Sequence, residues 1–132
     1  MIAQSRNKKN PKSRNQQLAR WGEALVGEVL REKGFTINAM NARTPYGEID
    51  LIASDGDGTR FIEVKTRSSQ AFGQPEDSIN LQKLNHMQQS AAWYIQIHPE
   101  LEQNWQIDVF AITVNPKNWN EHHVEWFENA IG

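Results

Sequence analysis

The sequence contains no cysteine and no long apolar run, and these absences exclude several classes of protein. Without cysteine, the chain is neither a disulfide scaffold, nor a thiol-dependent enzyme, nor a cysteine-ligated zinc protein. Its four histidines lack zinc-ligand spacing, and no glycine-rich loop is present to cradle a nucleoside triphosphate. No apolar stretch approaches the roughly 18 residues of a membrane span. At 132 residues the chain can bury one hydrophobic core. We therefore expect a soluble, cytoplasmic protein with no membrane partner.

Charge is unevenly distributed along the chain, whose net charge is −2. Residues 1–20 contain six Lys and Arg residues and no acid, so residues 21–132 have a net charge of −8. A basic arm on an acidic body indicates an anionic partner, such as nucleic acid, that is reached through the arm. A solvated tail that only keeps the chain soluble would have the same composition. We assign residues 1–16 to a basic N-terminal arm and residues 17–132 to a single domain.

Hydrophobic periodicity predicts two helices and five strands in the order α-β-β-β-α-β-β. Ser13 or Asn15 can cap the first helix, and Pro45 and Gly47 indicate a loop over residues 41–47. This order implies an α/β fold with a mixed β-sheet flanked by helices. The expected helices span about 16–33 and 78–97, and the expected strands span about 35–40, 48–54, 60–66, 105–114 and 123–127.

The second and third strands are joined by residues 55–58, Asp-Gly-Asp-Gly, which is a strong hairpin signal. A two-residue loop at its centre would place Asp50 opposite Glu63. The same register would place Glu48 opposite Lys65. Directly opposed side chains share a face with Cβ atoms about 5 Å apart, so the two carboxylates would repel. That repulsion is tolerated if one acid is protonated, if a base neutralises the pair, or if a cation lies between them.

A divalent cation suits this acid pair, because Mg²⁺ is commonly held by one or two carboxylates together with phosphate oxygens. Lys65, on the same strand face as Glu63, can orient the attacking water and neutralise charge that develops on a phosphate. A hairpin with a charged solvent face would show the same pattern, with Glu48 and Lys65 forming a surface ion pair.

A third acid can come from the first helix. Glu23 lies at one margin of the apolar face of that helix, and Glu28 lies at the opposite margin. Periodicity does not choose between them, and either acid alone is also typical of an ordinary helix surface.

Four further residues are candidates for nucleic-acid contacts. Arg43 and Arg67 flank the two carboxylate strands, where a guanidinium group can bind phosphate. Gln82 and Lys83 belong to the start of the second helix, where backbone N–H groups and an ammonium group can meet a phosphate. A solvated helix residue is an equal alternative for Lys83.

Short motifs extend from about residue 17 to the C-terminus, and together they resemble the YraN family, an uncharacterised protein family of the restriction-endonuclease-like superfamily. The motifs that carry this resemblance are Gly22-Glu23-Ala24, Gly34-Phe35, Asn41-x-Arg43, Gly47-Glu48-Ile49-Asp50-Leu51-Ile52, Phe61-Ile62-Glu63-Val64-Lys65-Thr66-Arg67, Phe72-Gly73, Gln82-Lys83, Ala91-x-x-Tyr94 and Glu128-Asn129-Ala130.

The resemblance implies a restriction-endonuclease-like fold, close to that of archaeal Holliday-junction resolvases, and a nuclease signature of Asp followed by Glu-x-Lys. One departure is residues 106–109, Gln-Ile-Asp-Val, where the family usually has Arg-Phe-Asp-Val. Carried over to this sequence, the catalytic residues would be Glu23, Asp50, Glu63 and Lys65, with Asp50, Glu63 and Glu23 as ligands of Mg²⁺ or Mn²⁺.

Two functional hypotheses follow. The first is a Mg²⁺- or Mn²⁺-dependent endonuclease that acts on nucleic acid, with DNA favoured over RNA. The alternative is a catalytically silent nucleic-acid-binding or scaffolding module on the same fold, which the net charge of −8 in the body and the lack of a clear substrate-reading element favour. A resolvase-like role would need a symmetric dimer to cut two strands. The sequence shows no dimer stripe and leaves a homodimer open.

Overall fold

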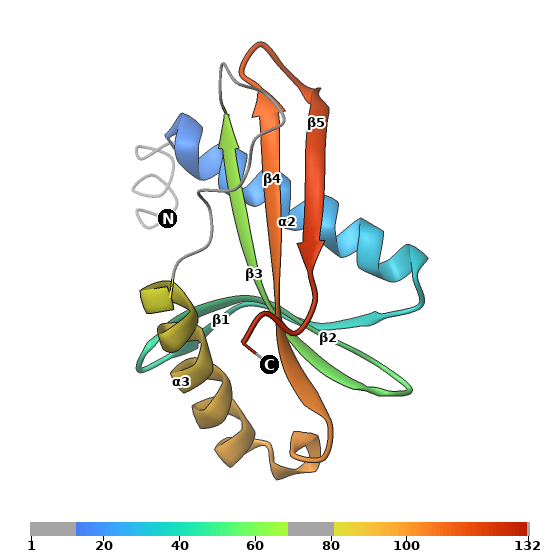
Figure 1. Cartoon of the computed structure of the whole chain (residues 1–132), viewed down its shortest axis with the longest axis vertical. Helices are drawn as coiled ribbons and strands as arrows, with labels where there is room; N and C mark the ends of the chain where they lie inside the picture. The colour runs from blue at the N-terminus through green and yellow to red at the C-terminus, as the bar shows by residue number, and fades with distance from the viewer. Residues whose placement is uncertain (1–12, 69–80, 132) are drawn as a thin grey trace, which may run out of the picture.

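A computed structural model of the chain describes residues 13–68 and 81–131. Its elements follow the expected order, and the α/β class is confirmed (Figure 1). The basic arm up to residue 12 and residues 69–80, which include the start of the second expected helix, lie outside the described residues. The elements are α2 (Arg14–Glu32), β1 (Thr36–Thr44), β2 (Gly47–Asp55), β3 (Gly58–Ser68), α3 (Leu81–Ile97), the short 3₁₀ helix η2 (Pro99–Leu101), β4 (Trp105–Asn115) and β5 (Asn118–Phe127).

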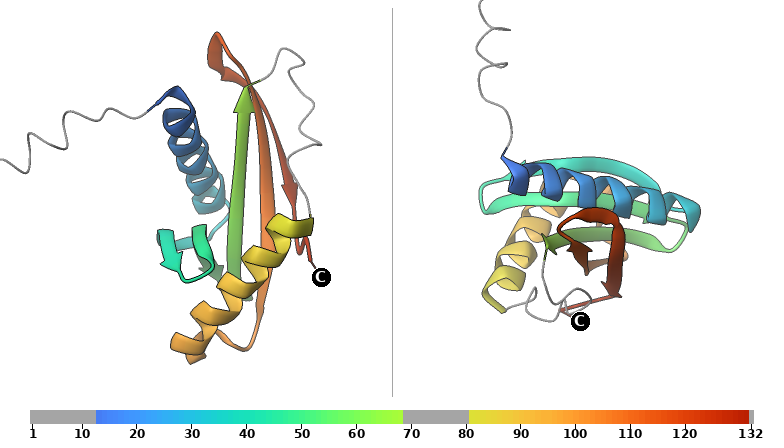
Figure 2. Two further views of the ribbon diagram at one scale, coloured as in Figure 1. Left: turned by 90° about the vertical axis from the view of Figure 1, so that its left-hand side faces the viewer. Right: turned by 90° about the horizontal axis from the view of Figure 1, so that it is seen from above.

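The five strands form one mixed sheet in the order β1-β2-β3-β4-β5. β3 and β4 are parallel and the other neighbours are antiparallel. A parallel pair needs a long crossover connection, and α3 lies between β3 and β4 in the chain. α2 covers one face of the sheet and α3 covers the other (Figure 2). Consequently Ile62 and Val64 of β3 pack beneath α2, whereas Phe61 packs beneath α3. Alternation along β3 therefore directs Glu63 toward the α3 side.

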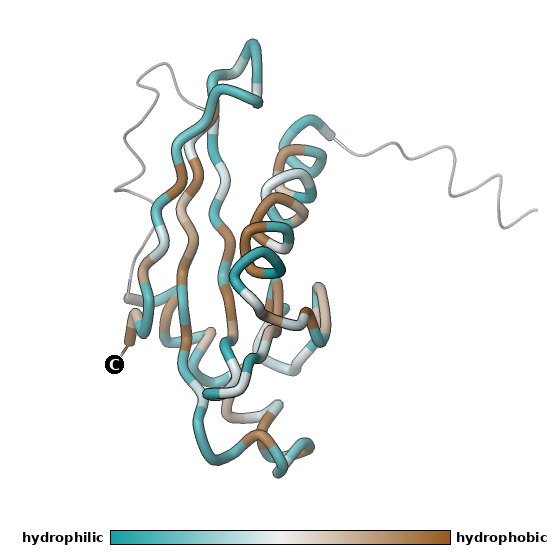
Figure 3. Tube along the Cα trace, turned by 90° about the vertical axis from the view of Figure 1, so that its right-hand side faces the viewer, coloured by the Kyte–Doolittle hydropathy of each residue, from teal (hydrophilic) through white to brown (hydrophobic). Residues whose placement is uncertain are grey.

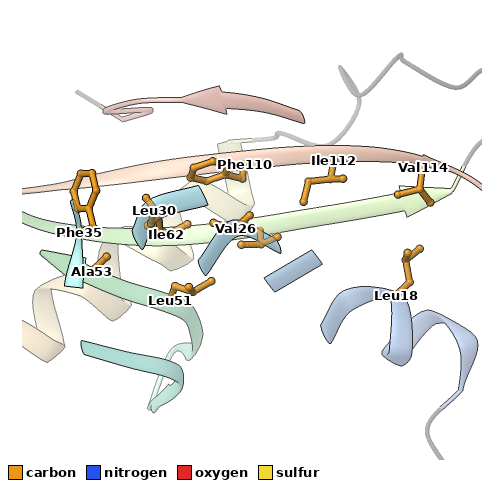
Figure 4. Packing of buried hydrophobic residues seen from close by; sticks show 11 residues of the cluster. Leu18, Val26, Leu30, Phe35, Leu51, Ala53, Ile62, Phe110, Ile112 and Val114 are labelled. Carbon is orange, nitrogen blue, oxygen red and sulfur yellow. The ribbon is translucent and has the colours of Figure 1, made fainter. Parts of the chain in front are cut away.

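The first helix starts about two residues earlier than expected, because Ser13 rather than Asn15 caps it. Ser13 and Gln16 form a reciprocal capping box, so α2 starts at Arg14 and includes the last residues of the predicted arm. Leu18, Val26 and Leu30 are buried against the sheet (Figure 4). Hydrophobic residues recur along α2 and the central strands, while the β4–β5 tip is hydrophilic (Figure 3). No helix in the described part of the chain is long and apolar enough to cross a membrane.

The predicted loop over residues 41–47 is wrong. β1 continues to Thr44, and a two-residue turn at Pro45-Tyr46 leads directly into β2. Pairing decides this, because Ala42 lies opposite the fully buried Ile49. Proline and glycine mark a tight turn as well as a long loop, so the local signal did not distinguish them. β5 is likewise longer than expected, since a tight turn pairs it with β4 from Asn118 onward.

Candidate active site

β2 and β3 pair in the predicted register near their hairpin and then separate. Ladder pairing runs from Asp55–Gly58 to Leu51–Ile62, which confirms the two-residue loop. Beyond that pair, the Asp50 carboxylate accepts a hydrogen bond of 2.8 Å from the Val64 backbone N–H. A side-chain oxygen of β2 therefore bonds a backbone N–H of β3 just beyond the last backbone pair of the ladder.

Because the strands separate, the predicted pairing of Glu48 with Lys65 is wrong. Glu48 is exposed and lies opposite Arg43 of β1, while Lys65 lies opposite Ala111 of β4. Asp50 and Glu63 are likewise not a ladder pair, although both face one cavity. The predicted register is therefore confirmed from Asp55–Gly58 to Leu51–Ile62 and is wrong for the pairs beyond Leu51.

A cavity of about 330 Å³ opens between β2, β3 and α3. Asp50 and Glu63 come from the two strands, and Lys83 and His86 come from α3. His86 is exposed, and the sequence did not indicate it because the four histidines lack zinc-ligand spacing. The complete lining is Tyr46, Gly47, Glu48, Asp50, Glu63, Lys83, His86, Met87 and Ser90.

Burial raises the pKa of Asp50 to about 7, and repulsion from Glu63 adds to the effect. The hydrogen bond from Val64 and the nearby Lys83 both oppose the rise without cancelling it. Glu63 is itself buried, with 7% of its surface exposed. The protein therefore places two acids at one cavity with too little positive charge nearby to keep the pKa of Asp50 at its ordinary value.

Lys83 is the base that partly neutralises this pair. Its ammonium nitrogen lies 3.1 Å from a carboxylate oxygen of Glu63. Burial lowers the pKa of Lys83, but the attraction and hydrogen bond of Glu63, together with Asp50, raise it above its ordinary value. Lys65 is half-buried and close enough to affect that pKa, but it does not line the cavity. The α3 lysine thus contacts the acids more directly than the lysine of the Glu-x-Lys motif.

Glu23, rather than Glu28, faces the sheet. Glu23 is buried on α2, where it accepts hydrogen bonds from Arg20 at 2.9 Å and from the Asn41 side chain at 3.2 Å, while Glu28 is exposed. Its charge contributes to the raised pKa of Asp50, so the two acids lie in one electrostatic neighbourhood. Glu23 remains outside the cavity lining.

Arg20 and Asn41 have roles that the sequence did not indicate. The pKa of Arg20 is raised chiefly by its hydrogen bond and attraction to Glu23, and further by Glu48 and Asp50. Asn41 adopts a positive φ of 53°, a conformation that asparagine tolerates. Helical spacing alone would only have shown that Arg20 and Glu23 can pair.

The acids fit a divalent cation as a pair, not as a preassembled set of three. Within residues 13–68 and 81–131, no group of three or more His, Asp or Glu side chains is arranged to hold a metal ion. Asp50 and Glu63 suffice as protein ligands for Mg²⁺, which keeps several waters and takes substrate phosphate oxygens. Glu23 is engaged by Arg20 and Asn41, so the predicted three-acid set is not brought together.

The remaining nucleic-acid candidates lie on elements that surround this site. Arg43 is exposed on β1 beside Glu48, a residue of the cavity lining. Arg67 is half-buried near the end of β3, and Gln82 is exposed in the first turn of α3. The structure therefore groups Arg43 with the cavity and leaves Arg67 further along the strand.

Gln106, which departs from the family pattern in β4, donates a hydrogen bond to the buried acid Asp108. Asp108 is fully buried and accepts hydrogen bonds from Arg60 at 2.8 Å and from the Trp126 indole, the Gln106 amide and the Asn129 backbone at 2.9 Å each. Gln106 supplies one of these bonds, although it stands where the family pattern has arginine. Asp108 is a satisfied structural acid that joins β4 to the C-terminal segment.

Comparison with known proteins identifies the family. The model of the uncharacterised protein family UPF0102 matches residues 22–112. The chain belongs to the UPF0102 family. A UPF0102 protein of Syntrophomonas wolfei is 36% identical over 110 residues, which cover 83% of this chain and 96% of the relative. A UPF0102 protein of Thermodesulfovibrio yellowstonii is 39% identical over 115 residues, covering 87% and 96%. Another, from Beutenbergia cavernae, is 39% identical over 92 residues, covering 70% and 78%.

UPF0102 is the YraN family, so the resemblance drawn from the motifs is confirmed. The matched region of this UPF0102 protein extends from Gly22 in α2 to Ile112 in β4. It includes the cavity and all eight residues predicted for catalysis, metal binding or nucleic-acid contact.

Proposed function

We propose that this UPF0102 protein is a Mg²⁺- or Mn²⁺-dependent nuclease that hydrolyses phosphodiester bonds in DNA or structured nucleic acid. The observation that carries the proposal is the cavity in which Asp50 of β2, Glu63 of β3 and Lys83 of α3 converge. Two crowded acids are costly to a fold that makes no use of them, and a divalent cation would remove their repulsion.

Asp50 and Glu63 would hold the metal ion. When bound, the ion would act as a Lewis acid on the phosphate and would lower the pKa of a water molecule, and both effects promote phosphodiester hydrolysis. Asp50 must be ionised to act as a ligand, so it gives up a proton on binding, and metal affinity should rise as the pH passes 7. Glu23 would complete the site through water, held in place by Arg20 and Asn41.

The two lysines would act on the substrate. Lys83, which contacts Glu63 in the structure, would turn to a phosphate oxygen of the substrate if a cation neutralised that acid. Lys65 projects from the same strand as Glu63 and would orient the attacking water or offset charge on the phosphate. Arg43, Arg67 and Gln82 would bind flanking phosphates, and the basic arm would add sequence-independent affinity.

A silent binding module is the second candidate, and one feature favours it. The acids of the site already have protein partners, since Glu63 pairs with Lys83 and Glu23 pairs with Arg20. A protein that retained the fold without turnover would keep these pairs as structural contacts.

A cleavage screen separates the two candidates. Wild-type protein is incubated with linear, flapped, four-way and single-stranded DNA and with RNA, in Mg²⁺, in Mn²⁺ or in chelator. Cleavage is expected with metal only, and Asp50→Asn and Glu63→Gln should abolish it. Glu28→Gln is the matched control, because it removes an exposed acid of α2 and should leave cleavage unchanged. If micromolar protein binds these substrates but cleaves none of them, the silent module is favoured.

A further inference from the structure

An exposed aromatic side chain on the cavity rim is not used by the proposed chemistry. Tyr46 is 48% exposed and lines the cavity together with Asp50 and Glu63. The other large hydrophobic side chains exposed in the described part of the chain are Met40, Ile97 and Ile131, and none of these lines the cavity. A single exposed aromatic ring is ordinary on a protein surface, so what points to a ligand is its place in the lining of the candidate phosphodiester site.

The turn that carries Tyr46 is held from two directions. The Thr44 hydroxyl accepts from the Tyr46 backbone N–H at 3.1 Å and donates to the Gly47 carbonyl at 2.6 Å. The same oxygen shares a hydrogen bond of 2.9 Å with the Ser90 hydroxyl of α3. These bonds tie the β1–β2 turn to the helix on the other side of the cavity. The backbone beneath the ring is fixed in advance, so a ligand that meets the ring orders little besides its two side-chain torsions.

The surroundings of Tyr46 suit a nucleotide. Arg43 is exposed on the same hairpin, and Lys83 lines the same cavity, so cationic groups come from two of the elements around the ring. Aromatic side chains placed among cationic groups bind single-stranded nucleic acid by stacking on its bases. In a continuous duplex both faces of each base are already stacked, so only an unpaired, terminal or extruded base can present a face to this ring.

We propose that Tyr46 stacks on an unpaired base next to the scissile phosphate, so that the site selects single-stranded or branched nucleic acid over continuous duplex. This inference rests on the proposed function, because it takes the cavity to be the phosphodiester site. The phenol hydroxyl is not required, so phenylalanine should replace tyrosine.

The test is binding by the full chain in chelator, which prevents cleavage. A fluorescent single-stranded oligonucleotide and a duplex of the same sequence are titrated by anisotropy. Loss of one base–aromatic stack weakens binding by about tenfold or more. Tyr46→Ala should therefore lose about tenfold on the single strand and less than twofold on the duplex, and Tyr46→Phe should restore both. Ile97→Ala is the matched control, since Ile97 is 52% exposed at the far end of α3.

A 2-aminopurine base in the single strand gives an independent readout, because its fluorescence is quenched by stacking and Tyr46→Ala should relieve the quenching. An unchanged ratio of single-strand to duplex affinity in Tyr46→Ala would overturn the role of Tyr46 and leave a nuclease that still cleaves. Wild-type protein that neither binds nor cleaves any nucleic acid would overturn the proposed function, and the role of Tyr46 with it.

Discussion

Asp50→Asn should stabilise the metal-free protein at high pH, which is unusual for a change at a half-buried residue. The substitution keeps the shape of the side chain and an oxygen that can accept the bond from Val64. It removes the charge whose burial and repulsion by Glu63 raise the pKa of Asp50 from 3.8 to about 7. A carboxyl with a raised folded-state pKa binds more protons in the folded protein than in the unfolded one between those values. Wild-type stability therefore falls as the pH rises from about 4 to about 7, and the variant lacks that fall.

The size of the effect has an upper and a lower bound. A rise of about three pKa units corresponds to about 4 kcal/mol, since each unit is 1.36 kcal/mol. Relaxation of the side chains and access of water reduce this figure for a half-buried carboxylate. An exposed cross-strand pair is worth only about 0.2–1 kcal/mol. Between these bounds we expect Asp50→Asn to gain roughly 1–2 kcal/mol over wild type at pH 8 and almost nothing at pH 4.

Urea unfolding of both proteins at pH 4, 6 and 8 in chelator measures this difference, and Glu28→Gln provides the control for loss of an exposed acid. Addition of Mg²⁺ at pH 8 should then reverse the order. A cation at 100 times its Kd stabilises the protein that binds it by about 2.7 kcal/mol, and Asp50→Asn should gain less because a ligand is missing.

The opposite pattern would refute the reasoning. If the fold needed the negative charge of Asp50 to strengthen the bond from Val64, Asp50→Asn would cost about 1–3 kcal/mol at pH 4, 6 and 8, with or without metal. Such a loss would remove Asp50 from the proposed metal ligands.

Three further predictions concern the surroundings of the site. Lys83→Met should tighten Mg²⁺ binding by about two- to fivefold in calorimetry, because the half-exposed ion pair with Glu63 competes with the cation; weaker binding would contradict this. Gly22→Ala should destabilise the fold by about 1–3 kcal/mol, since the added Cβ would overlap the Thr66 hydroxyl, and the double variant with Thr66→Ala should recover most of that loss in thermal melts. Deletion of residues 1–12 should flatten the salt dependence of DNA binding, with a slope reduced by up to about 3.6 for four lost phosphate contacts; an unchanged slope would assign the arm to solubility.

Local signals predicted the parts of the fold that local interactions decide. The structure uses Ser13, one of the two caps that the sequence offered, and it confirms the loop at residues 56–57; both features rest on bonds within four residues. The end of β1 could not be predicted in this way. Its pairing depends on Ala42 meeting Ile49 across the sheet, and Pro45 reads alike in a loop and in a tight turn.

The same distinction between local contacts and contacts across the fold applies to the candidate site. Asp50 and Glu63 were predicted to lie together because the hairpin brings them close in the chain, and they do share one cavity. The partner of Glu63 comes from another element, since it is Lys83 of α3, and Glu23 is bonded by Asn41 of β1 as well as by Arg20 of its own helix. Helical periodicity shows that such a base is near a helix surface. The packing of that helix on the sheet determines which acid the base reaches.

The point where the predicted register ended also explains how the cavity arises. A ladder continued through Asp50 and Glu63 would have held β2 against β3 by backbone hydrogen bonds and left no space between them. The Asp50 carboxylate instead bonds the Val64 N–H, so the two strands stay joined by one side chain while their backbones separate. β2 then follows β1, and α3 borders the space that opens. Asp50, which would bind the cation, thus also bridges the two strands beside the cavity. For this reason asparagine, which keeps an acceptor oxygen, is the informative replacement.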